Sequence, residues 1–212
     1  MNIKSFTFNI FQENTFVVYD KSKKCIIIDP GCYSKKEEEE LSEFIIEKEL
    51  TPVKLINTHC HIDHILGNQF VTEKWDLELY MHKKDIPLLE NAGAIGKIYG
   101  IDEFKGSPFP KHFLNEGDIL TFGNSEFKIL FTPGHAPGHI CLYSKANNFL
   151  IAGDVLFQGS VGRTDLPGGD HNTLINSIIT QLFPLPNETQ VFCGHGAATN
   201  LGYEKEHNPF LQ

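Results

Sequence analysis

The sequence lacks the features of a membrane or secreted protein. No hydrophobic run approaches the ~20 residues that a transmembrane helix needs. The N-terminal segment alternates apolar with polar residues and is followed by no small-residue cleavage site, so we expect no signal peptide. The five cysteines are an odd number and none forms a C-x-x-C pair, which favours reduced thiols over a disulfide framework. We therefore expect a cytoplasmic protein.

A surplus of basic residues is also missing. The 18 lysines and arginines are outnumbered by 27 acidic residues, which leaves a net charge of -9. Nucleic acids and anionic membranes are themselves negatively charged, so neither is expected as a partner. A hydrophobic content of 41% in 212 residues is ordinary for a globular protein. These features indicate a soluble domain of the size of an enzyme, and they do not indicate its oligomeric state.

The hydrophobic pattern predicts a mixed α/β fold. Strands are expected at residues 3–8, 14–20, 25–28, 53–58, 77–81, 119–122, 126–131, 140–144, 149–151 and 189–193. Helices are expected at residues 34–50, 65–72, 83–91 and 170–182, the first of them capped by Ser34 and Glu37. Residues 92–110 are expected to form a loop or lid, and residues 153–169 a glycine-rich loop. Two packed sheets with helices outside them predict an α/β sandwich, which residues 1–212 are long enough to form as a single domain.

The strongest chemical signal is the run HCHIDH at residues 59–64, directly after a predicted strand. His59 and His61 are two residues apart, so in an extended segment their side chains point to the same side. A tight turn can then direct Asp63 and His64 toward a second point. One short segment could thus serve two metal ions.

Three further segments place a ligand residue type after a predicted strand. They are TPGH at residues 132–135, Gly153-Asp154, and CGHG at residues 193–196. Each contains a glycine, which lets the backbone approach a buried ion closely. Together with the first run they supply five histidines and two aspartates, enough for two ions that share a bridging ligand.

These segments resemble the metallo-β-lactamase superfamily, and within it the glyoxalase II (hydroxyacylglutathione hydrolase) branch. The matching stretches are THCHIDHILG at residues 58–67, TPGHAPGH at residues 132–139, Gly153-Asp154 and GHG at residues 194–196. They occur in the family's order along nearly the whole chain. The resemblance implies the αββα fold.

The resemblance also implies a set of metal ligands. His59, His61 and His135 would hold a first ion, whereas Asp63, His64 and His195 would hold a second, with Asp154 bridging both. Asp63 and Asp154 are then the catalytic carboxylates. Two divalent ions are expected, zinc in the first place, with iron or manganese as alternatives.

The implied reaction is hydrolysis of a thioester such as S-lactoylglutathione, by attack of a metal-bridging hydroxide. The products would be a 2-hydroxy acid and glutathione. A thiol with a pKa near ~8.5 leaves readily as thiolate, so no strong general acid is required. Larger glyoxalase II enzymes add a C-terminal helical domain that contacts glutathione. Only 17 residues follow His195 here, so the chain is more similar to a short branch without that domain, and the sequence does not show whether glutathione is recognised.

Other functions remain open. A persulfide dioxygenase of the same superfamily also resembles the chain in THCH at residues 58–61 and GRTD at residues 162–165, and would use one iron held by His59, His135 and Asp154. A lactonase or phosphodiester-cleaving hydrolase is a second alternative. A non-enzymatic binding protein on the same fold is a third, although the full ligand set argues against it.

Several residues near the ligands are expected to support them, to bind substrate or to be structural. Asp29 is expected to hydrogen-bond the ligand segment from beneath, and His139 is either a similar supporting residue or an ordinary packed histidine. Arg163 could bind a substrate carboxylate or could simply pair with Asp165. Cys60 is expected to be a buried structural thiol. Four other histidines are expected to be structural: His82, His112, His171 and His207.

Overall fold

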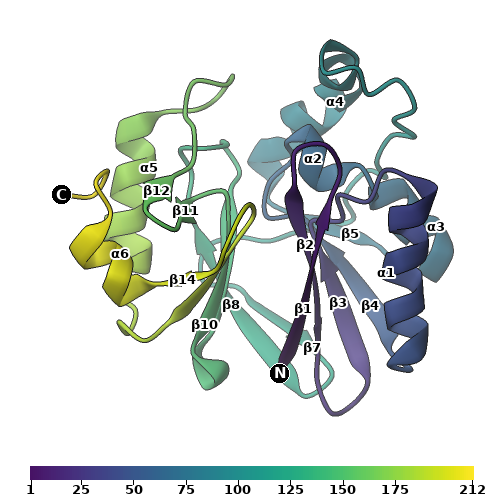
Figure 1. The fold of residues 1–212 in the computed structure, drawn as a ribbon, viewed down its shortest axis with the longest axis horizontal. Helices are drawn as coiled ribbons and strands as arrows, with labels where there is room; N and C mark the ends of the chain where they lie inside the picture. The colour runs from purple at the N-terminus through teal and green to yellow at the C-terminus, as the bar shows by residue number, and fades with distance from the viewer. The chain divides into compact units, whose positions relative to one another are not determined.

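The structure is a computed structural model that describes residues 1–212. The chain forms two compact units, each built on a six-stranded sheet with helices packed on it (Figure 1). Unit 1 comprises Met1–Phe113 and Thr121–Ser125, and unit 2 comprises Leu114–Leu120 and Glu126–Gln212. No helix is long and apolar enough to cross a bilayer.

The first sheet has the order β1-β2-β3-β4-β5-β6. Its strands are Asn2–Phe8, Glu13–Tyr19, Lys24–Ile28, Thr51–Ile56, Leu79–Met81 and His112–Phe113. The first three pair in antiparallel fashion, and β3 to β6 pair in parallel. The helices are α1 (Lys35–Glu47), α2 (Ile62–Ile65), α3 (Asn68–Trp75), the short 3-10 helix η1 (Lys83–Asp85) and α4 (Ile86–Ile98).

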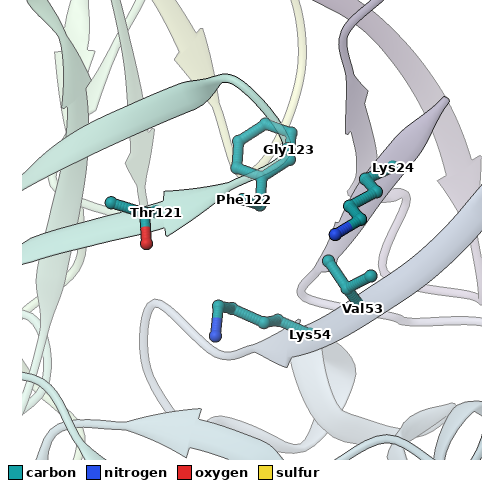
Figure 2. Close-up of a pocket in the computed structure, with 6 residues that line it drawn as sticks. All are labelled: Lys24, Val53, Lys54, Thr121, Phe122 and Gly123. Carbon is teal, nitrogen blue, oxygen red and sulfur yellow. The ribbon is translucent and has the colours of Figure 1, made fainter. Parts of the chain in front are cut away.

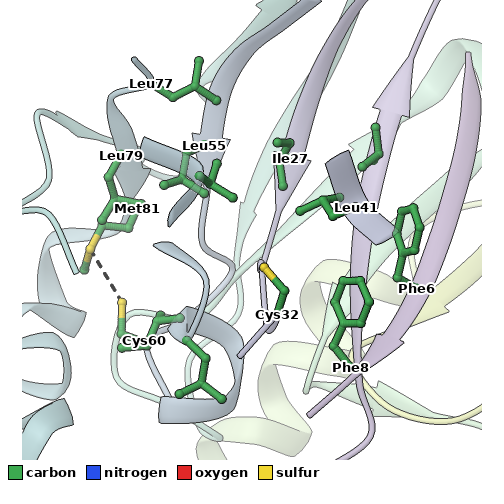
Figure 3. Close-up of a cluster of buried hydrophobic side chains, with 14 of the residues drawn as sticks. Phe6, Phe8, Ile27, Cys32, Leu41, Leu55, Cys60, Leu77, Leu79 and Met81 are labelled. Atoms are coloured by element: carbon green, nitrogen blue, oxygen red, sulfur yellow. Dashed lines mark hydrogen bonds between the residues drawn. The ribbon is translucent and has the colours of Figure 1, made fainter. Parts of the chain in front are cut away.

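The core of unit 1 lies between this sheet and its helices (Figure 3). All four apolar residues of β3, which are Cys25, Ile26, Ile27 and Ile28, are fully buried, as expected for a central strand with parallel pairing on one side. Leu41 and Ile45 of α1 pack into the same cluster. These contacts hold the carboxyl ends of β3 and β4 in a fixed position.

Helix α1 begins where the sequence predicts. Ser34 accepts a hydrogen bond from the Glu37 backbone N–H (3.3 Å), and the Glu37 carboxylate accepts one from Ser34 (2.8 Å), which together form a capping box. Glu37 also accepts a hydrogen bond from the backbone N–H of Asn9, in the turn between β1 and β2 (2.7 Å). The cap therefore joins the first hairpin to the helix.

The second sheet has the order β14-β13-β10-β9-β8-β7. In chain order its strands are Ile119–Phe122, Ser125–Phe131, Ile140–Ser144, Phe149–Gly153, Gln190–Cys193 and Thr199–Asn200. A short 3-10 helix η2 (Lys145–Asn147) joins β9 to β10, and a two-stranded hairpin joins β11 (Leu156–Phe157) to β12 (Ser160–Val161). Helix α5 (His171–Ser177) continues into a π-helical turn η3 (Ile178–Leu182), and α6 (Leu201–His207) follows β14. Leu174, Ile178 and Leu201 pack these helices into the core of unit 2.

The sequence predicted most of these elements, with three corrections. The single helix predicted at residues 65–72 is two helices, because α2 ends at Ile65 and α3 begins at Asn68. The segment 92–110 is not irregular throughout, because α4 continues to Ile98. The loop 153–169 contains the β11–β12 hairpin. The pattern also missed β6, β14 and α6, which are short and carry few apolar positions.

Asp20 ties two turns of unit 1 together. It follows β2, and one of its carboxylate oxygens accepts hydrogen bonds from the backbone N–H of Asn124 (2.7 Å) and the hydroxyl of Ser125 (2.8 Å), while the other accepts from Ser22. Burial by itself would raise the pKa of this carboxyl. The hydrogen bonds from Ser22, Ser125 and Asn124 outweigh that effect and lower the pKa from 3.8 to about 2. The ionised carboxylate therefore stabilises the folded protein.

We predict that Asp20→Asn lowers the free energy of unfolding at pH 7 by about 1–3 kcal/mol, since hydrogen bonds to a charged acceptor are lost. Because the folded pKa is depressed, the stabilisation is fully present above about pH 4 and disappears as the pH falls toward 2. Denaturant unfolding between pH 2 and pH 7 checks this, with the exposed Asp102→Asn as the control. A difference between wild type and Asp20→Asn that did not shrink below pH 4 would contradict the assignment.

Candidate metal centre

The candidate ligands of unit 1 lie at one edge of its sheet. Strands β3, β4 and β5 are parallel, so their carboxyl ends meet at the same edge. Asp29 follows β3, the run His59–His64 follows β4, and η1 with Asp85 follows β5. The strand topology alone therefore brings polar residues from three parts of the sequence together.

Within the run, the imidazole rings are close to one another. The centroid of the His59 ring lies 4.8 Å from that of His61 and 4.1 Å from that of His64. Asp63 and His64 lie in the single turn of α2, and the Asp63 Oδ2 is 3.6 Å from the His64 Nε2. His59 and His64 are buried, whereas His61 and Asp63 are partly exposed. The helical turn, rather than the predicted tight turn, brings Asp63 and His64 back toward the histidine pair.

Asp29 supports this run from the end of β3. It is fully buried, and its Oδ1 accepts a hydrogen bond from the backbone N–H of Thr58 (2.7 Å). Its Oδ2 accepts one from the Thr58 hydroxyl (2.5 Å) and lies 3.2 Å from the Nδ1 of His64. The ligand atoms of Asp29, His59 and His64 lie within 4.8 Å of one another. Because both Asp29 oxygens are already engaged, the geometry suits a residue that orients His64 rather than a ligand.

Thr58 orients the next histidine. Its hydroxyl oxygen lies 3.1 Å from the Nδ1 of His59. A hydrogen bond at Nδ1 selects the tautomer in which Nε2 carries the lone pair for a metal. Asn57 adds a further contact by donating to the carbonyl oxygen of His64 (3.1 Å). The segment is thus held by hydrogen bonds along its length.

Glu13 is a buried carboxylate that sequence reasoning missed. Its Oε2 accepts a hydrogen bond from Thr15 (2.9 Å), and its Oε1 lies 3.8 Å from the Nδ1 of His64. Burial raises the pKa of this carboxyl well above its usual value, although the charge of His64 acts in the opposite direction. Glu13 begins β2 beside the polar residues Asn14 and Thr15, so the local sequence carries no sign of its burial.

The candidate ligands of unit 2 also lie at a single sheet edge. Asp154 follows β10 and His195 follows the parallel neighbour β13. His135 follows β8, which runs in the same direction because β9 is antiparallel to both β8 and β10. The Nε2 of His135 is 3.5 Å from the Asp154 Oδ2, and the Nε2 of His195 is 3.4 Å from the same oxygen. Two imidazoles thus approach one carboxylate oxygen.

These separations fit metal ligands. Two atoms bound 2.0–2.1 Å from one tetrahedral ion lie about 3.4 Å apart, which is the spacing of both histidine nitrogens from Asp154. It is longer than the 2.7–3.2 Å of an N–H···O hydrogen bond. Imidazole and carboxylate are also the donors that zinc, iron and manganese accept. The residues present therefore fit a metal site.

Hydrogen bonds orient this half of the site as well. The Nδ1 of His135 lies 2.7 Å from the carbonyl oxygen of Arg163, which leaves Nε2 for the Asp154 side. The Nε2 of the buried His139 accepts a hydrogen bond from the backbone N–H of Asp154 (3.0 Å), and its Nδ1 lies 3.2 Å from the Thr132 hydroxyl. His139 therefore contacts the backbone of the candidate bridging residue.

Gly162 leaves room for these residues. A Cβ atom at this position would lie 1.9 Å from the carbonyl oxygen of Asp154 and 3.1 Å from the Nδ1 of His135. Both distances are shorter than ordinary van der Waals contact, so any larger side chain would displace Asp154. The glycine is required here by close approach, as the sequence suggested for the ligand loops in general.

Arg163 is exposed and forms a bidentate ion pair with Asp165. Its Nε and one terminal nitrogen each lie 2.7 Å from an Asp165 oxygen. The hydrogen bond from Arg163 lowers the pKa of Asp165 to about 2. Of the two expected roles the structure contains the internal pair, and substrate binding by Arg163 stays a prediction.

The remaining sequence predictions concern residues outside the ligand set. Cys60 is buried, and its thiol contacts the sulfur of Met81 (3.6 Å). Burial raises the pKa of the thiol well above the usual value, so Cys60 does not act as a thiolate nucleophile.

The other four histidines lie outside the ligand set. His82 accepts a hydrogen bond from the backbone N–H of Lys84, His112 stacks on Tyr80, and His207 stacks on Tyr203. His171 is the first residue of α5.

A shallow pocket of about 280 Å³ lies elsewhere in unit 1 (Figure 2). It is lined by Lys24, Val53, Lys54, Thr121, Phe122 and Gly123. Lys24 begins β3 and Val53 lies near the start of β4, whereas the candidate ligands follow the carboxyl ends of these strands. The pocket is therefore separate from the metal-ligand cluster.

Comparison with known proteins identifies relatives of similar length. A hydroxyacylglutathione hydrolase, GloC, of Haemophilus influenzae is 38% identical over 212 residues, covering 100% of this chain and 98% of that protein. A probable metallo-hydrolase of Bacillus subtilis, YqgX, is 42% identical over 191 residues, covering 89% of this chain and 87% of that protein.

Solved structures with the same fold include a B3 metallo-β-lactamase, BLEG-1, with a TM-score of 0.91, 36% identity and full coverage of both chains. A second is TTHA1623 in a di-iron-bound form, with a TM-score of 0.88 and 38% identity, covering 98% of this chain and 100% of that one. ETHE1 from Myxococcus xanthus is 24% identical with a TM-score of 0.80, and the match covers 99% of this chain and 84% of that one. At this identity the likeness shows the fold alone.

A family model described as the metallo-beta-lactamase superfamily matches residues 9–195. This match and the similar structures confirm the predicted αββα metallo-β-lactamase fold. The clustered histidines and aspartates of each unit agree with the metal-dependent chemistry of that family. The chain is therefore a metal-dependent hydrolase of the metallo-β-lactamase superfamily.

Proposed function

We propose that the protein is a cytoplasmic thioesterase of the hydroxyacylglutathione hydrolase type, which cleaves S-(2-hydroxyacyl)glutathione to a 2-hydroxy acid and glutathione. The observation that carries the proposal is the 38% identity to the GloC hydrolase over the full length of this chain, and the clustered histidines and aspartates of each unit support it. The partner is then a small-molecule thioester.

We propose His59, His61, Asp63, His64, His135, Asp154 and His195 as the residues that hold two divalent ions, with zinc, iron and manganese as candidates. When bound, such ions supply a hydroxide nucleophile at neutral pH and polarise an acyl carbonyl. The contribution of the protein is orientation: Asp29 and Thr58 direct the rings of His64 and His59, and the Arg163 carbonyl directs His135.

The side chains around the ligands support hydrolysis by water rather than by a protein nucleophile. Cys60, the thiol within the ligand run, is buried against Met81 and has a pKa raised well above the ordinary value. A covalent acyl-enzyme needs an activated nucleophile next to a base, and Cys60 is neither exposed nor ionised. A thiolate leaving group also needs no strong acid from the protein. This agrees with a site in which Asp63 and Asp154 are candidate metal ligands and so would not serve as general acids.

We predict that the metal-loaded protein hydrolyses S-lactoylglutathione and that Asp154→Ala lowers kcat/KM roughly a thousandfold, because several kcal/mol of transition-state stabilisation are lost. Release of the thiol, followed with a thiol reagent, measures the rate, and the exposed Asp102→Asn is the control. The proposal fails if wild type is no faster than Asp154→Ala. A protein that holds one iron and consumes oxygen with glutathione persulfide would instead be a dioxygenase.

We also predict that Arg163→Gln raises KM for S-lactoylglutathione about 3–10-fold and leaves kcat nearly unchanged. The guanidinium is exposed beside Asp165, so a substrate carboxylate can replace that partner, and solvent reduces the strength of the pair. Asp165→Asn is the matched variant, because it removes the internal pair but keeps the arginine. Equal increases of KM in both variants would mean that the pair only maintains the loop.

A further inference from the structure

Asp85 is a buried carboxylate close to the candidate ligands that the proposed mechanism does not use. It is fully buried at the end of η1, directly before α4. Aspartate before a helix normally caps it by accepting a hydrogen bond from the first turn, but the Asp85 side chain makes no such bond to α4. Burial of a carboxylate is unfavourable unless other groups stabilise it, so this orientation requires an explanation.

The carboxylate is turned toward the ligand run. Its Oδ2 accepts a hydrogen bond from the backbone N–H of Cys60 at 3.0 Å. Cys60 lies between His59 and His61, so this bond fixes the peptide that separates the two candidate ligands. The Cys60 thiol is held by the same part of the fold, because it contacts Met81 at the end of β5 (Figure 3).

Asp85 and Asp29 hold the ligand run in the same way, because each accepts a backbone N–H from a residue next to His59. Asp29, at the end of β3, accepts the N–H of Thr58 at 2.7 Å, and Asp85, beyond the end of β5, accepts the N–H of Cys60. The strand between them, β4, leads into the ligand run. Two buried carboxylates, one from beyond each of the strands that flank β4, thus accept the backbone N–H groups of the residues before and after His59.

We propose that Asp85 is a positioning residue of the metal centre. It fixes the backbone between His59 and His61 through the Cys60 N–H. The proposal rests on the metal-binding part of the proposed function and does not depend on the thioester.

The test compares Asp85→Ala with Asp85→Asn, and Asp102→Asn serves as an exposed control. Zinc affinity is measured without substrate by competition with a chelating indicator, and the visible spectrum of the cobalt-substituted protein reports ligand geometry. Asp85→Ala is expected to weaken zinc binding about 10–100-fold, as loss of a residue that orients ligands typically does, and to change the cobalt spectrum. Asp85→Asn keeps an oxygen acceptor, so it is expected to retain the wild-type spectrum and lose less affinity than the alanine variant.

Unchanged zinc affinity and cobalt spectrum in Asp85→Ala, with lower thermal stability alone, would overturn the proposal and leave Asp85 a structural residue. If Asp85→Ala does not fold, Asp85→Glu replaces it, because the longer side chain keeps a carboxylate but moves the acceptor oxygen. Cobalt spectra and zinc affinities identical to wild type in both Asp85→Glu and Asp85→Asn would also overturn the proposal. A wild-type protein that binds zinc but cleaves no thioester would refute the proposed substrate without affecting Asp85, whereas one that binds no metal would refute both.

Discussion

The carboxylate of Asp29 is the contact on which the candidate ligand run of unit 1 depends. It is buried at the end of a central strand, where a lone charge would be strongly unfavourable. The backbone N–H and hydroxyl of Thr58 and the ring of His64 surround it. The same contacts that stabilise the buried charge set the path of the ligand run, so the sheet edge and the candidate ligands depend on the same hydrogen bonds.

In each unit a polar group faces the Nδ1 of a candidate ligand histidine, but the kind of group differs. In unit 1 the Nδ1 of His64 faces a carboxylate, and in unit 2 the Nδ1 of His135 faces a backbone carbonyl. Both leave Nε2 beside a candidate carboxylate ligand, Asp63 in one half and Asp154 in the other. Placement after strands whose carboxyl ends share a sheet edge makes this possible, because it brings residues distant in sequence together on a rigid frame.

The features that the sequence predicted are those with local signals. The capping box at Ser34, the buried strands and the spacing of His59 and His61 are all visible within a few residues, and the structure contains them. Helix α2 was missed because four residues are too short for a helical period to appear. Asp85 and Glu13 were missed for another reason: their contacts with Cys60 and His64 join segments that are distant in the sequence, and no local pattern encodes such a contact.

The burial of every cysteine has a consequence for how the protein acquires its metal. All five thiols are buried, and burial raises the pKa of Cys25 and Cys193 to about 12, so the thiolate that soft ions prefer is not offered. Only imidazole and carboxylate donors remain, and for such donors supply and the general order of divalent affinities govern which ion is bound. The metal content of a purified sample is therefore expected to follow the medium in which the cells grew, and comparison of activities between preparations requires that the loaded ion be known.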